Sequence, residues 1–328
     1  MNIRLPISKS IANRLLLLQA IHGDPLYGVP KELDSNGVSL RVSADMPDDV
    51  RVLHDALQAL RQYQSVQSAK SVNEKEPLTL YLKNCGTALR FLEVHLAQCY
   101  PGEPITLTGD ARLMERKGKP TTQTTSALIL HGVNVPVEAN ESPYITMSRK
   151  MAQAYQPSLA DTIERDWSAA AFWYEYVAIH GGELLLDGLT DNSLQGDRIV
   201  ADIYAEHFGV TTTFTPQGVK ISNLHSPISN LQSSIAIDFT NCPDLYPAIA
   251  LTCERLGITL HATGTERLAY KECNRLEAVA RHETRHDHRM AMALLAAGFV
   301  VDDTDCIAKS YPEFLKQLQA VAAHFERG

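Results

Sequence analysis

The chain repeats one local plan, in which a short apolar strand leads through a polar turn into the start of a helix. Segment 78–82 leads into NCGTALRFL, ITLT at 105–108 leads into GDARLMER, and ELLLDGL at 183–189 leads into NSLQGD. SLRVSA at 39–44 also alternates like a strand. Strands that alternate with helices are typical of α/β proteins, and 328 residues suffice for two domains. We therefore predict an α/β fold in two domains.

The opening segment LPISKSIANRLLLLQA (5–20) places polar and cationic side chains at the start of a predicted helix. Ser8 or Ser10 can cap that helix, and Lys9 and Arg14 lie close to its beginning. Unpaired N–H groups and the helix dipole favour anions at this end, and the two cations suit phosphate or carboxylate. The segment predicts an anion site. The alternative is a capped amphipathic helix with two solvated cations.

Two later junctions carry a similar signal. Gly86 lets a ligand approach the backbone closely, and Thr87 can cap the next helix or donate to a ligand. Further along, TTQTTSAL brings hydroxyl groups and Gln123 ahead of an apolar run. The basic residues between these junctions are Arg112, Arg116, Lys117 and Lys119. They predict either a second anion contact or a solvated basic loop.

Composition argues against several classes of protein. The net charge is −8 and the pI about 5.8, so no basic face for nucleic acid is expected. Six scattered cysteines without a C-x-x-C pair indicate reduced thiols. The apolar runs are too short for a membrane span, and no signal-peptide pattern opens the chain. We expect a cytoplasmic protein without a membrane partner.

Three histidines, His282, His286 and His288, raise the question of a metal site. No carboxylate or cysteine frame surrounds them at the spacing typical of zinc ligands. Arg285 and Arg289 would also repel a cation. We expect neither a metal nor a cofactor.

Ten motifs together resemble one known family. In chain order they are LPISKSIANR, NCGTALRFL, LTGDARLMER, TTQTTSAL, SPYITM, NSLQGD, CPDLYPAIA, GTERLAYKECNRL, HDHRMAM and CIAKSYPEF. They extend from Leu5 to Phe314 and are similar to the 3-phosphoshikimate 1-carboxyvinyltransferase family, also called EPSP synthases. The sister family that acts on a UDP-sugar shares the fold but lacks the SKS…NR and DARLMER signatures. It is the weaker match.

The resemblance implies two similar domains of repeated βαβαββ units, arranged as an inside-out α/β barrel. The domains would comprise 9–164, on the shikimate 3-phosphate side, and 1–8 plus 165–328, with the catalytic carboxylates. The active site would lie in the cleft between them. The implied reaction transfers the enolpyruvyl group of phosphoenolpyruvate to the 5-hydroxyl of shikimate 3-phosphate, releases phosphate, and serves aromatic amino acid biosynthesis. It needs no cofactor, and the enzyme would be a monomer.

The resemblance also implies roles for individual residues. The catalytic groups would be Asp244 as the base for the hydroxyl proton, and Glu272, with Lys9 as its competitor, for the C3 proton of phosphoenolpyruvate. The residues implied to bind the two substrates are Lys9, Ser10, Arg14, Gly86, Thr87, Arg116, Thr121, Thr122, Gln123, Tyr144, Asp244, Lys271, Arg275, His288, Arg289 and Lys309. No residue is implied to bind a metal.

The sequence departs from the family pattern in three places. Glu141 stands where a serine is usual, which leaves Ser142 as the alternative phosphate contact. The spans Arg116–Gln123 and Glu272–His288 are short, each by most of a helix plus a hairpin. Either two units are trimmed and incomplete, or residues are missing within 116–123 and 278–286. A trimmed protein could be a non-catalytic anion-binding relative, so that alternative stays open here beside UDP-sugar transfer.

Overall fold

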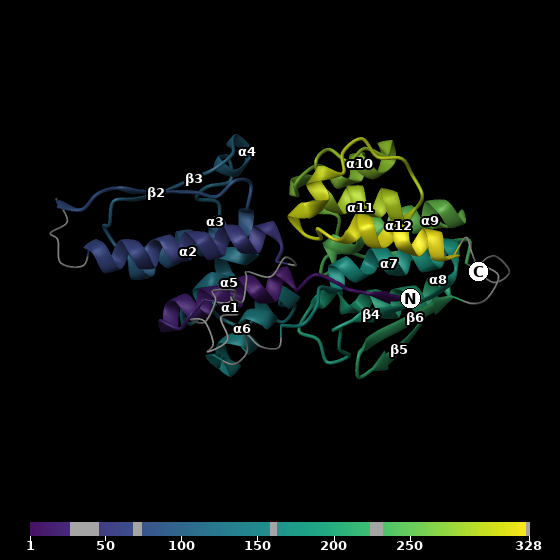
Figure 1. Cartoon of the computed structure of the whole chain (residues 1–328), viewed down its shortest axis with the longest axis horizontal. Coiled ribbons are helices and arrows are strands. Elements are labelled where there is room, and N and C mark those ends of the chain that lie inside the picture. The colour runs from purple at the N-terminus through teal and green to yellow at the C-terminus, as the bar shows by residue number, and fades with distance from the viewer. Residues whose placement is uncertain (27–45, 68–73, 158–162, 224–231, 326–328) are drawn as a thin grey trace, which may run out of the picture. The chain divides into compact units, whose positions relative to one another are not determined.

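The computed structural model describes residues 1–26, 46–67, 74–157, 163–223 and 232–325 (Figure 1). The strand predicted for SLRVSA (39–44) lies outside these residues. The chain divides into an N-terminal unit, Lys9–Ile163, and a C-terminal unit, which joins Met1–Ser8 to Glu164–Gly328. The chain passes from one unit to the other twice, after Ser8 and before Glu164. These two residues are adjacent in space, since the Ser8 N–H donates to the Glu164 carbonyl at 2.9 Å.

The N-terminal unit consists of six helices and two strands in its described part. These are α1 (Lys9–His22), α2 (Asp48–Gln67), β2 (Leu78–Tyr81), α3 (Gly86–Cys99), β3 (Ile105–Thr108), α4 (Ala111–Met114), α5 (Thr122–Leu130) and α6 (Pro143–Ala154). The strands β2 and β3 pair in parallel. Each predicted polar turn ends at a helix start, as the sequence pattern requires.

Local chemistry explains where the helices of the N-terminal unit begin. The Cys85 thiol accepts from the Ala88 N–H at the start of α3, so Cys85 and not Thr87 is the cap residue. Thr121 and Thr124 form a reciprocal capping box at the start of α5. Pro143 is the first residue of α6, where the N–H that proline lacks would have no helical partner.

The C-terminal unit is built around α7 (Trp167–His180), a helix that is buried on nearly every side. Asp166 caps it and accepts from the Ala169 N–H at 3.0 Å. Trp167, Trp173 and Tyr174 are fully buried in the surrounding core. A helix that is apolar all round must be enclosed by other elements, and α7 accordingly packs against α8, α9, α11 and β4.

The other elements of this unit surround α7 (Figure 1). They are β1 (Asn2–Ile3), β4 (Gly182–Asp187), η3 (Gly196–Ile199), α8 (Val200–Phe208), β5 (Thr211–Thr215), β6 (Gly218–Asn223), β7 (Ser234–Asp238), η4 (Pro243–Leu245), α9 (Tyr246–Leu256), β8 (Thr259–Thr263), η5 (Glu266–Tyr270), α10 (Arg275–Arg281), α11 (His288–Ala296), η6 (Asp305–Lys309) and α12 (Phe314–Phe325).

Strand pairing in the described part of the C-terminal unit produces two sheets. The first has the order β1-β4-β6-β5, with β1 parallel to β4 and antiparallel pairing elsewhere. The second is the parallel pair of β7 and β8. The structure therefore confirms the mixed α/β class, and β5 and β6 form an antiparallel hairpin. No helix in the described part of the chain is both long and apolar enough to cross a bilayer.

Both short spans are closed by backbone hydrogen bonds. In the first, the Lys119 N–H donates to the Arg116 carbonyl at 3.2 Å, directly before the cap of α5. In the second, the Glu283 N–H donates to the Ala278 carbonyl at 3.0 Å. In the turn that follows, His282, Arg285 and His286 all have positive φ, which is uncommon outside glycine. Each span is therefore a compact turn between two helices in this structure.

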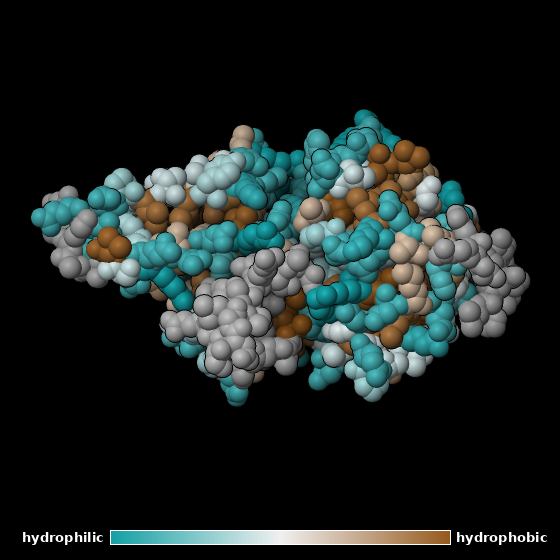
Figure 2. Space-filling model, in the orientation of Figure 1, coloured by the Kyte–Doolittle hydropathy of each residue, from teal (hydrophilic) through white to brown (hydrophobic). Residues whose placement is uncertain are grey.

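Part of the surface of the N-terminal unit is apolar (Figure 2). A hollow of about 230 Å³ lies between α2 and β2, and Val52, Ala56 and Leu80 line its apolar part. Tyr81 on the same strand is 61% exposed. Ala56 and Leu80 are nonetheless buried, so the exposed apolar surface beside this hollow is mainly that of Tyr81.

Candidate active site

Arg275 is the centre of a charged cluster in the C-terminal unit. It is the first residue of α10 and is only 1% exposed. Its Nη1 donates to Asp244 Oδ1 at 2.7 Å, and its Nη2 donates to Glu272 Oε2 at 2.9 Å. Its Nε donates to Asp287 Oδ2 at 2.7 Å. The planar guanidinium thereby holds three carboxylates, two of which are the predicted catalytic pair.

Short helical turns position these carboxylates. Asp244 lies in η4 between Pro243 and the start of α9, so its backbone is fixed before the helix begins. Asp287 caps α11 and accepts from the Arg289 N–H at 2.9 Å. Asp287 was not predicted as a site residue, although it lies beside His288 in the motif HDHRMAM.

Three further cations surround the two predicted catalytic carboxylates. Lys271 Nζ lies 3.2 Å from Asp244 Oδ1, and Arg289 Nη2 lies 3.2 Å from Asp244 Oδ2. Lys309 Nζ lies 3.5 Å from Glu272 Oε1. Lys271 and Lys309 are partly exposed, so an anionic ligand can reach them without unfolding the cluster. The structure therefore brings together six of the predicted residues in one unit, including Arg275.

The cations set the protonation state of Asp244. Burial alone would raise the pKa of its carboxyl, because charge is poorly solvated away from water. Arg289, Lys271 and Arg275 outweigh burial and hold the pKa of Asp244 well below its ordinary value. Asp244 is therefore a carboxylate at neutral pH.

Asp197 lies next to this cluster and shows the opposite shift. Burial and the nearby Asp244 charge raise the pKa of Asp197 to about 7, although the Ser168 hydroxyl donates to its carboxylate. Asp197 ends the motif NSLQGD and is 4% exposed. Sequence analysis did not select it, and only its place in that motif could have drawn attention to it.

The N-terminal unit holds the second group of predicted residues, beginning with Arg14. This side chain is 3% exposed, and its Nε donates to the Ser148 hydroxyl at 2.7 Å. It also donates to the Ser10 carbonyl at 2.8 Å and to the Tyr144 carbonyl at 3.0 Å. Burial lowers the pKa of Arg14 to about 10, and the side chain stays charged at neutral pH. Arg14 thus fixes Tyr144 to the start of α1.

The helix starts of α3 and α5 are also linked. Gln123 Nε2 donates to the Thr87 hydroxyl at 2.7 Å, which joins two predicted substrate contacts. A Cβ atom built on Gly86 would meet nothing within 4 Å, so the backbone there is open to an approaching group. Lys9 Nζ lies 3.0 Å from Asp49 Oδ2 at the start of α1. Thr121 and Thr122 begin α5 beside Gln123, and Arg116 follows α4.

Glu141 has a partner of its own in the structure. Its carboxylate accepts from Arg149 Nε at 2.9 Å and from the Thr146 hydroxyl at 3.2 Å. Ser142 precedes α6, and its hydroxyl makes no cap hydrogen bond. The substitution of serine by glutamate is therefore accommodated by an ion pair next to Tyr144.

The three histidines between 282 and 288 do not form a cluster in the structure. His282 Nε2 lies 2.8 Å from Glu254 Oε1 and stacks on Phe299. His286 is exposed and pairs with Asp303, whereas His288 is fully buried at the start of α11. Within the described residues, these three imidazoles do not lie close enough to hold a metal ion together.

Comparison with known proteins identifies the family. The family model for EPSP synthase (3-phosphoshikimate 1-carboxyvinyltransferase) matches residues 1–156, 126–283 and 279–318. The chain belongs to this family. A 3-phosphoshikimate 1-carboxyvinyltransferase of Bacteroides fragilis is 26% identical over 97% of this chain and 94% of the relative. One of Erwinia tasmaniensis is 25% identical over 96% of this chain and 95% of the relative. The resemblance inferred from the ten motifs is thereby confirmed.

A solved structure supports the fold of this EPSP synthase family member. The EPSP synthase from Acinetobacter baumannii aligns with a TM-score of 0.56, covering 98% of this chain and 95% of that chain, at 16% sequence identity. The alignment with the Bacteroides relative spans 396 positions, whereas 97% of this chain is only about 318 residues. About 78 positions must therefore be gaps in this chain, in agreement with its two short spans.

Proposed function

We propose that this chain is a 3-phosphoshikimate 1-carboxyvinyltransferase that transfers the enolpyruvyl group of phosphoenolpyruvate to the 5-hydroxyl of shikimate 3-phosphate. The observation that carries the proposal is the Arg275 cluster, in which one buried guanidinium holds Asp244 and Glu272 among three cations. Carboxylates can move protons, and the cations can neutralise the phosphate and carboxylate groups of both substrates. Membership of the EPSP synthase family makes the UDP-sugar and non-catalytic alternatives the less favoured ones.

In the addition step, Asp244 accepts the proton of the 5-hydroxyl as the hydroxyl oxygen bonds to C2 of phosphoenolpyruvate. A proton is delivered to C3 at the same time, which gives a tetrahedral ketal that still carries the phosphate. The low pKa of free Asp244 makes it a weak base. Binding of phosphoenolpyruvate would draw Lys271 and Arg289 toward the ligand and so raise the basicity of Asp244 when it is needed.

In the elimination step, the bond between C2 and the phosphate oxygen breaks and phosphate leaves. A proton departs from C3, and the double bond between C2 and C3 forms again as an enol ether. Glu272 is the proposed group for the C3 proton in both steps, with Lys9 as the competitor. The interaction of Glu272 with Lys309 and Arg275 orients its carboxylate for this role.

The binding roles follow from charge and hydrogen-bonding capacity. In the C-terminal unit, Lys271, Arg289 and Lys309 are proposed to hold phosphoenolpyruvate, together with Arg275 and the buried His288. In the N-terminal unit, Gly86, Thr87 and Arg116 are proposed to contribute to the same substrate. The proposed shikimate 3-phosphate contacts are Lys9, Ser10, Arg14, Thr121, Thr122, Gln123 and Tyr144. Arg14 would act mainly through its charge, because four hydrogen bonds already engage its guanidinium.

We also infer that the two units are shortened forms of the βαβαββ architecture. The gaps relative to the Bacteroides relative support this inference. The proposed protein is a cytoplasmic monomer that uses neither a metal nor an organic cofactor for this reaction.

The test is a coupled phosphate-release assay with purified protein. Phosphate should appear only when shikimate 3-phosphate and phosphoenolpyruvate are both present. A UDP-sugar acceptor serves as the control substrate and should give no release. Release with the UDP-sugar and none with shikimate 3-phosphate would overturn the proposal, and binding of both substrates without turnover would identify the chain as a non-catalytic relative.

A further inference from the structure

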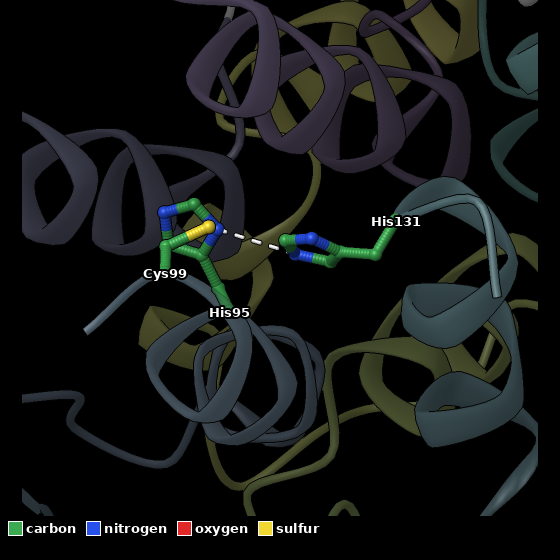
Figure 3. A group of neighbouring side chains, drawn as sticks. All are labelled: His95, Cys99 and His131. Carbon is green, nitrogen blue, oxygen red and sulfur yellow. Dashed lines mark hydrogen bonds between the residues drawn. The ribbon is translucent and has the colours of Figure 1, made fainter. Parts of the chain in front are cut away.

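His95, Cys99 and His131 form a compact group of metal-ligating side chains in the N-terminal unit (Figure 3). Each side chain offers one ligand atom, and the three atoms lie within 4.8 Å of one another. The two imidazoles are already in contact, with His95 Nδ1 at 3.2 Å from His131 Nε2. Figure 3 shows His95 and Cys99 on one helix, with His131 reaching them from a second helix.

The backbone explains why the three residues meet. His95 and Cys99 are four residues apart on α3, a spacing that places two side chains on one face of a helix. His131 is the C-cap residue of α5, which packs against α3. Helix α3 fixes the Cα positions of His95 and Cys99, and the C-cap of α5 fixes that of His131. The group is therefore held by regular structure and not by a loose loop.

The helix dipoles add a favourable field for a cation. Cys99 is the last residue of α3, and His131 directly follows the last residue of α5. The carboxyl end of a helix carries partial negative charge from carbonyl groups that lack helical partners, and it stabilises nearby cations. Cys99 and His131 each lie at such an end.

The two imidazoles carry no positive charge, which is one requirement for binding a metal. Burial, with smaller contributions from His131 and Arg61, lowers the pKa of His95 to about 4, and burial lowers the pKa of His131. Both rings are therefore neutral at pH 7. Burial raises the pKa of the Cys99 thiol, so this proton must be displaced to solvent when a metal binds. The thiolate charge would then offset the positive charge of Arg61.

We propose that His95, Cys99 and His131 bind one Zn²⁺ ion, with water as the fourth ligand. Tetrahedral nitrogen and sulfur ligands at about 2.0–2.3 Å from zinc lie about 3.3–3.6 Å apart. The contact between the two imidazoles is already close to this separation, and the thiol lies within 4.8 Å of both ligand nitrogens, so a small side-chain rotation would bring it in. One imidazole must change tautomer, since one of the facing nitrogens now carries a proton. The ion would tie the carboxyl ends of α3 and α5 together.

This site is separate from the residues of the proposed reaction and does not depend on that proposal. Its role would be structural, because it links two helices whose opposite ends carry Gly86 and Gln123. Zinc fits the ligand set better than Mg²⁺ or Ca²⁺, which prefer oxygen ligands.

The test uses the full-length protein with Co²⁺ as a spectroscopic substitute for Zn²⁺. The wild type should bind one Co²⁺ per chain with a thiolate charge-transfer band in the near ultraviolet, and Zn²⁺ should abolish the band by displacement. Cys99→Ser and His131→Gln should each weaken Zn²⁺ binding by more than about 100-fold, since even outer-shell partners of a metal contribute about 10–100-fold. His95 is buried and is left intact to preserve the fold.

Two matched controls complete the design. Cys306→Ser removes a partly buried thiol of the C-terminal unit, and His22→Gln removes an imidazole that stacks on Tyr155 in the N-terminal unit. Both should retain the Co²⁺ band and wild-type Zn²⁺ affinity. Zn²⁺ should raise the melting temperature of the wild type and both controls, but not that of Cys99→Ser. Absence of one-to-one binding in the wild type, or equal binding by Cys99→Ser, would overturn the proposal.

Discussion

Arg275 donates from Nη1 to Asp244 Oδ1 at 2.7 Å, and this ion pair is almost completely buried on the arginine side. The same guanidinium also engages Asp287, which is fully buried. Removal of one partner from a buried ion pair leaves an uncompensated charge, whose cost outweighs the net benefit of the pair itself. The cluster is thus a point where stability and the proposed chemistry depend on one side chain.

We predict that Arg275→Lys will destabilise the protein by about 3 kcal/mol, near the lower end of the range for broken buried pairs. Lysine keeps the charge but cannot donate to three carboxylates through a planar fork. Urea unfolding measures the change. Arg281→Lys, at the exposed end of the same helix α10, is the matched control and should change stability by less than about 0.5 kcal/mol. Equal effects of the two variants would contradict the central role of Arg275.

Asp244→Asn and Glu272→Gln should each lower kcat by about 10²–10⁴-fold, the typical contribution of a positioned acid or base. Calorimetry should show that shikimate 3-phosphate still binds, since its proposed contacts lie in the N-terminal unit. Glu254→Gln on α9 is the control, because its carboxylate is partly exposed and pairs with His282. Wild-type turnover in either active-site variant would remove that residue from the mechanism.

Much of the fold follows from short-range chemistry that sequence reveals. Asp166 and Thr121 cap their helices because a side-chain oxygen beside a free N–H can accept its hydrogen bond, and residue type and position suffice to predict this. The hairpin of β5 and β6 follows likewise from two alternating segments with a turn between them. Cys85 as the cap of α3 was missed, because a thiol is a weak acceptor that sequence patterns rarely favour.

The parts that sequence could not predict depend on long-range proximity. Asp287 contacts Arg275 because α10 and the turn after it bring the chain back beside the start of α10. No local sequence pattern predicts that contact. The group of His95, Cys99 and His131 joins two helices that are distant in sequence. Its only local signal was the spacing of four between His95 and Cys99. The histidines between 282 and 288 were adjacent in sequence but separate in space.

Lys309→Ala should weaken phosphoenolpyruvate binding by about 10–100-fold, because a hydrogen bond to a charged group contributes about 1.5–3 kcal/mol. Shikimate 3-phosphate binding should change much less, and Arg116→Ala in the other unit should show the same preference. Calorimetric titration of each ligand measures both effects. Lys316→Ala on α12 is the control, since this lysine is 83% exposed. Equal losses for both ligands would refute the assignment of these cations.

Asp197 should impose a pH dependence on stability that is opposite to that of most carboxyl groups. Its pKa of about 7 in the folded protein exceeds its ordinary value of 3.8. Between these limits the native state keeps a proton that the unfolded state has lost. The contribution of Asp197 to stability is therefore complete below about pH 4, falls as pH rises toward 7, and stays low above it. Asp244 does not change its protonation between pH 4 and pH 7, because its pKa lies well below its ordinary value.

Asp197→Asn removes this titration and should make the stability profile between pH 5 and pH 8 less steep than that of the wild type. The variant should be more stable than the wild type at pH 8, because it no longer buries a charge that Asp244 repels. Urea unfolding at each pH measures both effects. Asp202→Asn changes an exposed carboxylate on α8 that pairs with Arg198, and it should keep the wild-type slope. A slope in Asp197→Asn that equals the wild-type slope would assign the pH dependence to another group, of which Glu175 is the first candidate because burial raises its pKa.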